Sequence, residues 1–141
     1  MLVNKLNVYL SGAIAKVPDD FQQWRDQCLD YAQYYTNLKF IDPNTYFNYT
    51  DKLPDTDKQC QNLFVWMIDK CDAMLVNLDD SFRSVGTGME VEHAFCNNIP
   101  IIGFGKYETT WYPWIASRVS ATFEDLEDAI HYISHSYATV K

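Results

Sequence analysis

The chain lacks the positive charge and the long apolar runs that would place it on nucleic acid or in a membrane. It has 11 lysines and arginines against 19 aspartates and glutamates, and its formal net charge is -8. A nucleic-acid polymer needs a basic protein surface, so it is excluded as a partner. No stretch approaches the ~18 apolar residues of a membrane helix. Asn4, Lys5 and Asn7 interrupt the apolar residues that a signal peptide would need. We therefore expect a cytoplasmic protein with no membrane partner.

Cysteine is scarce, and its spacing excludes several kinds of site. The four cysteines, at positions 28, 60, 71 and 96, form no C-x-x-C pair. This argues against a zinc knuckle and against a thioredoxin-like redox motif. We expect most of them to pack as small apolar residues in a reducing compartment. Hydrophobic residues make up 48% of the 141 residues and charged residues 21%. The chain therefore has enough apolar side chains for one folded domain, residues 1–141.

Short apolar runs alternate with helical patterns along the chain. The apolar runs predict strands over residues 5–10, 38–41, 72–78, 99–104 and, more briefly, 118–121. Helices are predicted between them, and Thr122 is expected to cap a last helix. This order predicts an α/β fold with a doubly wound parallel sheet and helices on both faces. The first, third and fourth strands should form its centre, because they are the most continuously apolar.

Apolar residues in the helical segments recur at the spacing of a buried helix face. The first helix follows the acidic pair Asp19-Asp20, the second is capped by Asp55 or Thr56 and runs to about Cys71, and the third spans residues 86–98. The side chains expected to be buried are Phe21, Trp24, Cys28, Leu29 and Ala32 in the first helix, Leu63, Trp66 and Met67 in the second, and Leu126, Ala129, Ile130 and Ile133 in the last.

The most informative stretch runs from Ser84 to Ala94, with the sequence Ser-Val-Gly-Thr-Gly-Met-Glu-Val-Glu-His-Ala. It follows the third predicted strand and opens a helix, and ligands of open α/β sheets bind beyond the carboxyl ends of the strands. Gly86 and Gly88 would let the backbone come close to a ligand. Glu90 would lie near the positive end of the helix, where it should stay ionised. Such a carboxylate suits attack on a sugar carbon. The alternative is an ordinary acid at a helix start.

Three ordered segments resemble the nucleoside 2-deoxyribosyltransferase family. They are Tyr9-Leu10-Ser11-Gly12, Asp72-Ala73-Met74-Leu75-Val76, and Val85-Gly86-Thr87-Gly88-Met89-Glu90 with Ala94, and the strand Ile99-Pro100-Ile101-Ile102 follows them. The resemblance covers roughly residues 8–104. It implies a flavodoxin-like fold with a five-stranded parallel sheet. It also implies a homo-oligomer in which a neighbouring subunit completes the pocket.

The resemblance further implies a reaction. The glutamate at the position of Glu90 attacks C1′ of a 2′-deoxynucleoside and releases the base, and a second base or water then takes the sugar. Tyr9 lies near that glutamate. The expected substrate-binding residues are Ser11, Gly12, Asp80, Ser84, Gly86 and Gly88. The partner is a small-molecule nucleoside or nucleotide. No metal or organic cofactor is expected, because a side chain or water can protonate the leaving base.

Several positions depart from the family's pattern. The transferases carry an aspartate six residues before the nucleophile, where this chain has Ser84. A serine there resembles the branch that hydrolyses deoxynucleoside 5′-monophosphates, and a hydroxyl with helix N–H groups would bind a phosphate that an aspartate would repel. That branch also has a serine and an arginine after the strand-one glycine, where this chain has Ala13 and Ala15. The family aspartate eight residues before Asp72 is Phe64 here. This leaves open a nucleotide-binding module without catalysis.

Other side chains could take part in the chemistry. Asn62 or Asp69 could replace the missing aspartate. Asp79-Asp80 could bind the ribose or a metal or act as a general acid, although consecutive acids in a loop are more often solvated.

The Gly-Thr-x-x-Glu string at residues 86–90 also resembles the cytokinin-activating phosphoribohydrolases, which act on nucleoside 5′-monophosphates. Those enzymes carry a Pro-Gly-Gly before the string, which this chain lacks.

Histidines and aromatic residues provide weaker signals. His93 lies three residues after Glu90 and is expected to be packed or partly exposed rather than to steer the acid. His131 and His135 have the spacing of half a metal site, but no third ligand accompanies them. The aromatic run at residues 111–114 suits a subunit interface or the core more than base stacking.

Overall fold

A five-stranded parallel sheet forms the centre of the described residues. The computed structural model describes residues 4–13, 23–46, 56–79, 81, 84–106 and 113–140. The sheet order is β2-β1-β3-β4-β5. The strands are β1 (Leu6–Ser11), β2 (Leu38–Ile41), β3 (Ala73–Asn77), β4 (Ile101–Phe104) and β5 (Ala121–Phe123). The predicted α/β fold is therefore confirmed. The three strands expected at the centre lie there, and all their residues but Asn7 are buried.

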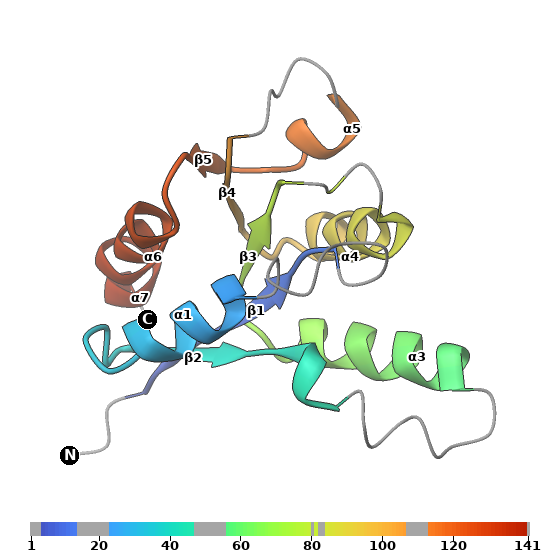
Figure 1. Cartoon of the computed structure of the whole chain (residues 1–141), viewed down its shortest axis with the longest axis horizontal. Coiled ribbons are helices and arrows are strands. Elements are labelled where there is room, and N and C mark those ends of the chain that lie inside the picture. Colours follow the sequence, from blue (N-terminus) through green and yellow to red (C-terminus); the bar gives the residue numbers. More distant parts are fainter. Residues whose placement is uncertain are drawn as a thin grey trace.

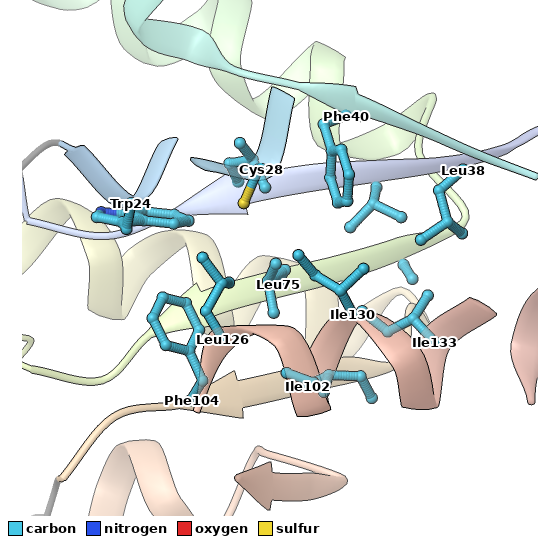
Figure 2. Close-up of a cluster of buried hydrophobic side chains, with 14 of the residues drawn as sticks. Trp24, Cys28, Leu38, Phe40, Leu75, Ile102, Phe104, Leu126, Ile130 and Ile133 are labelled. Atoms are coloured by element: carbon cyan, nitrogen blue, oxygen red, sulfur yellow. The ribbon is translucent and has the colours of Figure 1, made fainter. Parts of the chain in front are cut away.

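Helices cover both faces of this sheet (Figure 1). They are α1 (Gln23–Tyr31), the 3₁₀ turn η2 (Pro43–Tyr46), α3 (Thr56–Asp69), α4 (Val85–Cys96), α5 (Pro113–Ala116), α6 (Leu126–His135) and α7 (Tyr137–Val140). One buried cluster joins α1 and α6 to the sheet, and a second joins α3 and α4 to its other face. Figure 2 shows the first cluster, in which Trp24 and Cys28 face Leu126 and Ile130.

Strand β1 sends alternate side chains into the two clusters. Val8 and Leu10 belong to the cluster beneath α1 and α6, whereas Tyr9 belongs to the cluster beneath α3 and α4. Successive side chains of a strand point to opposite faces, so Ser11 lies on the same face as Tyr9. The sequence of β1 therefore places two hydroxyl groups on the face that α4 covers.

The last strand and the start of the last helix differ from their predicted positions. The strand expected at 118–121 is instead β5, in which Phe123 pairs with Phe104 of β4 and packs against Tyr132 of α6 at a ring distance of 5.2 Å. Thr122 lies inside this strand, and Asp125 is the residue before α6. The prediction of Thr122 as a cap is wrong, because pairing with β4 and packing on α6 extend the strand past it.

The buried helix faces agree with the predictions except at two positions. The four apolar residues expected on the last helix are all buried, as are Trp24, Cys28 and Met67. Leu29 is 46% exposed and Trp66 is 58% exposed, so both predictions of burial are wrong. Cys28 on α1, and Met67 and Ile68 on α3, pack against the sheet. Leu29 follows Cys28 and Trp66 precedes Met67, so these two side chains point away from the sheet. Phe21 lies outside the described residues.

The cysteines and the helices can be compared with the expectations of packed thiols and of no membrane helix. Cys28 and Cys71 are buried and Cys96 is exposed, and all three are free. The first two pack as apolar residues, as expected, while Cys96 does not. Among the described residues, no helix combines the length and the apolar character needed to cross a bilayer.

Candidate active site

The carboxylate of Glu90 lies between two hydroxyl groups of β1. The hydroxyl of Tyr9 donates a short hydrogen bond to Oε2 of Glu90, and Oγ of Ser11 donates to Oε1 at 2.9 Å. Tyr9 and Ser11 are fully buried, and Glu90 is half-buried. The two donors are two residues apart on one strand and therefore share a face. Three of the predicted site residues thus meet at the carboxyl end of β1.

The start of α4 is fixed by a side-chain cap. Oγ of Ser84 accepts a hydrogen bond from the backbone N–H of Thr87 at 3.1 Å and another from the Thr87 hydroxyl at 2.8 Å. The helix begins at Val85, so Glu90 is its sixth residue, and the first turn holds no acidic side chain. A helix dipole acts mainly on the first turn. Glu90 is therefore not an ordinary helix-start acid, because β1 rather than the helix end holds its carboxylate.

Burial governs the electrostatics of this group. Burial raises the pKa of the Glu90 carboxyl, while the hydrogen bonds from Tyr9 and Ser11 and the positive charge of Arg25 oppose the rise. Burial also raises the pKa of the Tyr9 hydroxyl, and the neighbouring Glu90 carboxylate adds to this effect. Tyr9 therefore remains a proton donor to Glu90. The expected support of the ionised form by the helix dipole is replaced by support from these three side chains.

Arg25 is a site residue that the sequence analysis missed. Its side chain is 2% exposed and lies over the Trp24 ring at 4.6 Å. Its guanidinium donates to the carbonyl oxygens of Leu10 at 3.0 Å and Gly12 at 3.1 Å, and it forms an ion pair with Asp42 at 2.9 Å. A signal was available: an arginine three residues before Cys28 lies on the face that the helical spacing predicts to be buried.

The predicted glycines fall into two groups. A Cβ at Gly12 would lie 3.0 Å from Cζ2 of Trp24 and 3.3 Å from Cβ of Asn77, so the missing side chain lets the end of β1 pack closely. Among the described residues, a Cβ at Gly86 would meet only Oγ of Ser84 at 3.9 Å, and one at Gly88 would meet nothing within 4 Å. The described side chains therefore leave the backbone at these two glycines uncrowded. A substrate-binding role for these glycines stays a prediction.

The acidic pair after β3 is only partly described. Oδ1 of Asp79 accepts a hydrogen bond from the N–H of Lys106 at 3.0 Å, beside Gly105, whose φ is 134°. Asp79 therefore ties the end of β3 to the end of β4. Asp80 lies outside the described residues, as do Ala15, Trp111 and Tyr112.

Other candidate groups are engaged away from Glu90. Nε2 of His93 lies 2.7 Å from Oδ1 of Asp69, which joins α4 to α3. Phe64 is partly buried in the cluster beneath these helices. Oδ2 of Asp72 accepts a hydrogen bond from the N–H of Asn7 at 2.8 Å and orders the start of β3. Asp69 is therefore bonded to His93 and not to Glu90, and the hydrogen bonds of the described residues place neither Asn62 nor Asp69 beside the Glu90 carboxylate.

Two further features carry no binding chemistry for this site. The His131 and His135 rings stack at 3.9 Å, and the described part of the chain contains no group of three metal-ligating side chains. An open groove of about 630 Å³ is lined by Leu6, Asp72, Pro100, Ser136, Tyr137 and Val140. It lies at the amino ends of β1, β3 and β4, which is the edge opposite to Glu90.

Comparisons with known proteins identify the fold. No protein-family model and no curated protein sequence matches the chain. Its structure is similar to that of the 2-deoxyribosyltransferase from the psychrotolerant bacterium Bacillus psychrosaccharolyticus, with a TM-score of 0.68, 16% identity and 95% of each chain covered. It is also similar to a conserved protein from Enterococcus faecalis V583, with a TM-score of 0.72 and 13% identity over 93% of this chain and 98% of that one. The flavodoxin-like fold implied by the sequence is confirmed.

We expect Glu90→Gln to raise the melting temperature at neutral pH. Burial holds the folded-state pKa of Glu90 above its unfolded value of about 4.3. In the interval above that value the folded protein keeps a proton that the unfolded chain has released, so stability falls as the pH rises through it. Glutamine carries no charge there and can still accept a hydrogen bond from Ser11. Thermal unfolding at a series of pH values should show a gain that grows from acidic to neutral pH.

The matched control is Glu92→Gln, on the same helix. Glu92 is exposed, and its hydrogen bond from Arg118 lowers the pKa of its carboxyl. This variant should therefore show no gain in melting temperature at neutral pH. A gain for Glu90→Gln that is the same at every pH would contradict the assignment of a raised pKa.

Proposed function

We propose that the chain cleaves or transfers the N-glycosidic bond of 2′-deoxynucleosides or their 5′-monophosphates, with Glu90 as the nucleophile. The observation that carries the proposal is the Glu90 carboxylate between the Tyr9 and Ser11 hydroxyls at the carboxyl edge of the sheet. Ligands of open α/β sheets bind at this edge. The likeness of the whole fold to a 2-deoxyribosyltransferase supports the same reaction class.

The proposed reaction has two displacement steps at C1′. An oxygen of ionised Glu90 bonds to C1′ while the C1′–N bond breaks, and the base leaves with the electron pair and takes a proton from a side chain or water. A second base, or water, then attacks C1′ and releases the Glu90 carboxylate, while the proton of the attacking group passes to solvent. Tyr9 and Ser11 hold both carboxylate oxygens and so restrict the direction of attack.

The cap of α4 supports recognition of the 5′ end of the substrate. Oγ of Ser84 accepts two hydrogen bonds from Thr87, so its own proton remains to be donated outward. A hydroxyl donor beside the N-terminus of a twelve-residue helix suits a 5′-hydroxyl or a 5′-phosphate. The uncrowded backbone at Gly86 and Gly88 would let the sugar approach the helix.

A nucleotide-binding module without turnover is the second candidate. Phe64 supports it, because this residue occupies the position of the family aspartate and is packed among apolar side chains. Tight nucleotide binding with no release of base would favour this candidate. A phosphoribohydrolase is the remaining alternative and would act on ribonucleoside 5′-monophosphates.

A cytoplasmic homo-oligomer is also part of the proposal. Free Cys28, Cys71 and Cys96 suit a reducing compartment. Large apolar side chains are exposed on α4 and on the two helices that contact it. They are Val85, Met89 and Phe95 on α4, Trp66 on α3 and Trp114 on α5. Aromatic and Met side chains are enriched in subunit interfaces. A second copy of this chain could therefore cover this surface.

Base release is the direct test of the reaction. Incubation with the four deoxynucleosides and their 5′-monophosphates, each with and without a second free base, should give a free base or a new nucleoside on chromatography. Glu90→Gln should lower turnover at least about a thousandfold, because it removes the nucleophile. Glu92→Gln changes the neighbouring exposed carboxylate and should keep turnover. Equal turnover in both variants would rule out the covalent role of Glu90.

Ser84 provides a test of the 5′ end. Ser84→Asp keeps a good helix cap but adds a negative charge, so it should lower kcat/KM for a 5′-monophosphate at least about tenfold more than for the nucleoside. Ser84→Asn keeps the cap without the charge and is the matched control. An equal loss for both substrates with Ser84→Asp would contradict a 5′-phosphate beside this residue.

The proposed interface can be tested by sedimentation. Met89 is an apolar residue of α4 that is 62% exposed, and Met89→Glu would place a charge there. We expect the wild-type protein to sediment as an oligomer and this variant as a smaller species. Val140→Glu makes the same change at an exposed apolar residue of α7 and should leave the oligomer intact. A monomeric wild-type protein would contradict the interface.

A further inference from the structure

Arg25 reaches the candidate site from the opposite face of the sheet. It belongs to α1, which packs with α6 on one face, whereas Glu90 belongs to α4 on the other (Figure 1). The guanidinium lies at the carboxyl end of β1 and pairs with Asp42, which directly follows β2. It therefore reaches β1 from the face opposite to α4, at the strand whose Tyr9 and Ser11 hold Glu90.

The hydrogen bonds of Arg25 enclose one residue. Nη1 donates to the carbonyl oxygen of Leu10 and Nη2 to that of Gly12, at 3.0 and 3.1 Å. The residue between these two carbonyls is Ser11, whose hydroxyl donates to Oε1 of Glu90. Two parallel bonds from a planar guanidinium fix direction as well as distance. The backbone on each side of Ser11 is therefore held in place.

A buried arginine needs several partners to remain charged without a large loss of stability. Arg25 has two carbonyls, the Asp42 carboxylate and the Trp24 ring. Its charge remains close enough to lower the pKa of both Glu90 and Tyr9. Two other ionisable pairs involve α4, His93 with Asp69 of α3 and Glu92 with Arg118, and in each pair the two side chains are bonded to each other. Arg25 is thus the cation that acts on Glu90 among the described residues.

We propose that Arg25 is a positioning residue for Glu90, which fixes the backbone around Ser11 and supplies positive charge behind the carboxylate. The inference deepens the proposed function, on which its catalytic part rests. A bidentate arginine contributes both the geometry of the Ser11 hydrogen bond and the field that favours the ionised nucleophile. A lysine in its place would supply the charge but could not hold both carbonyls in a fixed plane.

The experiment compares charge removal with charge conservation. Arg25→Met combined with Asp42→Asn removes the cation without leaving its carboxylate unpaired. Arg25→Lys keeps the charge. Arg118→Met is the matched control, because Arg118 also pairs with a carboxylate and lies over an aromatic ring, Phe95, at 4.3 Å. The carboxyl carbon of Glu90 is followed by NMR as the pH is varied, and kcat and KM are measured over the same pH range.

We expect the double variant to titrate Glu90 at higher pH than the wild type and to shift the acidic limb of its kcat profile in the same direction. Arg25→Lys should keep the Glu90 titration but lower kcat about tenfold or more at little change in KM, because the nucleophile is less well oriented. Arg118→Met should leave the titration and kcat unchanged. A merely structural role for Arg25 would lower the melting temperature without moving the Glu90 titration.

Each part of the inference has an outcome that overturns it. An unchanged Glu90 titration in a folded double variant overturns the electrostatic part, and wild-type kcat in Arg25→Lys overturns the geometric part. If the double variant does not fold, Arg25→Gln with Asp42→Asn provides the same titration with a polar side chain that can still bond one carbonyl. Wild-type protein without turnover on any substrate would refute the proposed function, while the NMR titration would still test the action of Arg25 on Glu90.

Discussion

The hydrogen bonds from Tyr9 and Ser11 to Glu90 join the two elements on which the candidate site depends. They connect the carboxyl end of β1 with the second turn of α4. Tyr9 is 81 residues from Glu90 along the chain, and Ser11 is 79 residues from it. A carboxylate that is withdrawn from water needs donors of this kind, because an unpaired buried charge is strongly unfavourable. The same burial raises the pKa of Glu90. The candidate site is therefore a compromise between the desolvation of this carboxylate, which favours its neutral form, and the groups that favour its charged form.

The parallel sheet makes that compromise possible because it separates the helix layer of α4, which carries Glu90, from the helix layer of α1, which carries Arg25. Alternation along β1 sends Tyr9 and Ser11 to the α4 face, while the backbone carbonyls of Leu10 and Gly12 meet Arg25 of α1. The positive charge of Arg25 can then act on Glu90 across this strand. Gly12 contributes by its missing side chain, since a Cβ would press against Trp24, the residue that lies beneath Arg25.

Several features could be predicted from the sequence because each depends on a local pattern. The alternation of apolar runs with helical spacing predicts the parallel α/β sheet, and the most continuously apolar runs predict the central position of β1, β3 and β4. The Gly-x-Gly-x-Glu stretch after β3 indicates Glu90, and the resemblance implies Tyr9 beside it. Local patterns were wrong where tertiary packing decides. Phe123 packs on α6 and extends β5 through Thr122, and the rotation of α3 against the sheet leaves Trp66 exposed.

The sequence by itself determined the fold class and the placement of the acid Glu90 on the helix that follows β3. These follow from periodicities of two and 3.6 residues and from the position of glycines after a strand. Only the tertiary structure decided what holds that acid. The partners of Glu90 come from β1 and, through the strand, from α1, and the hydrogen bonds of Arg25 to Leu10, Gly12 and Asp42 join three separate elements. No local pattern encodes such distances, because they are set by how the helices pack on the two faces of the sheet.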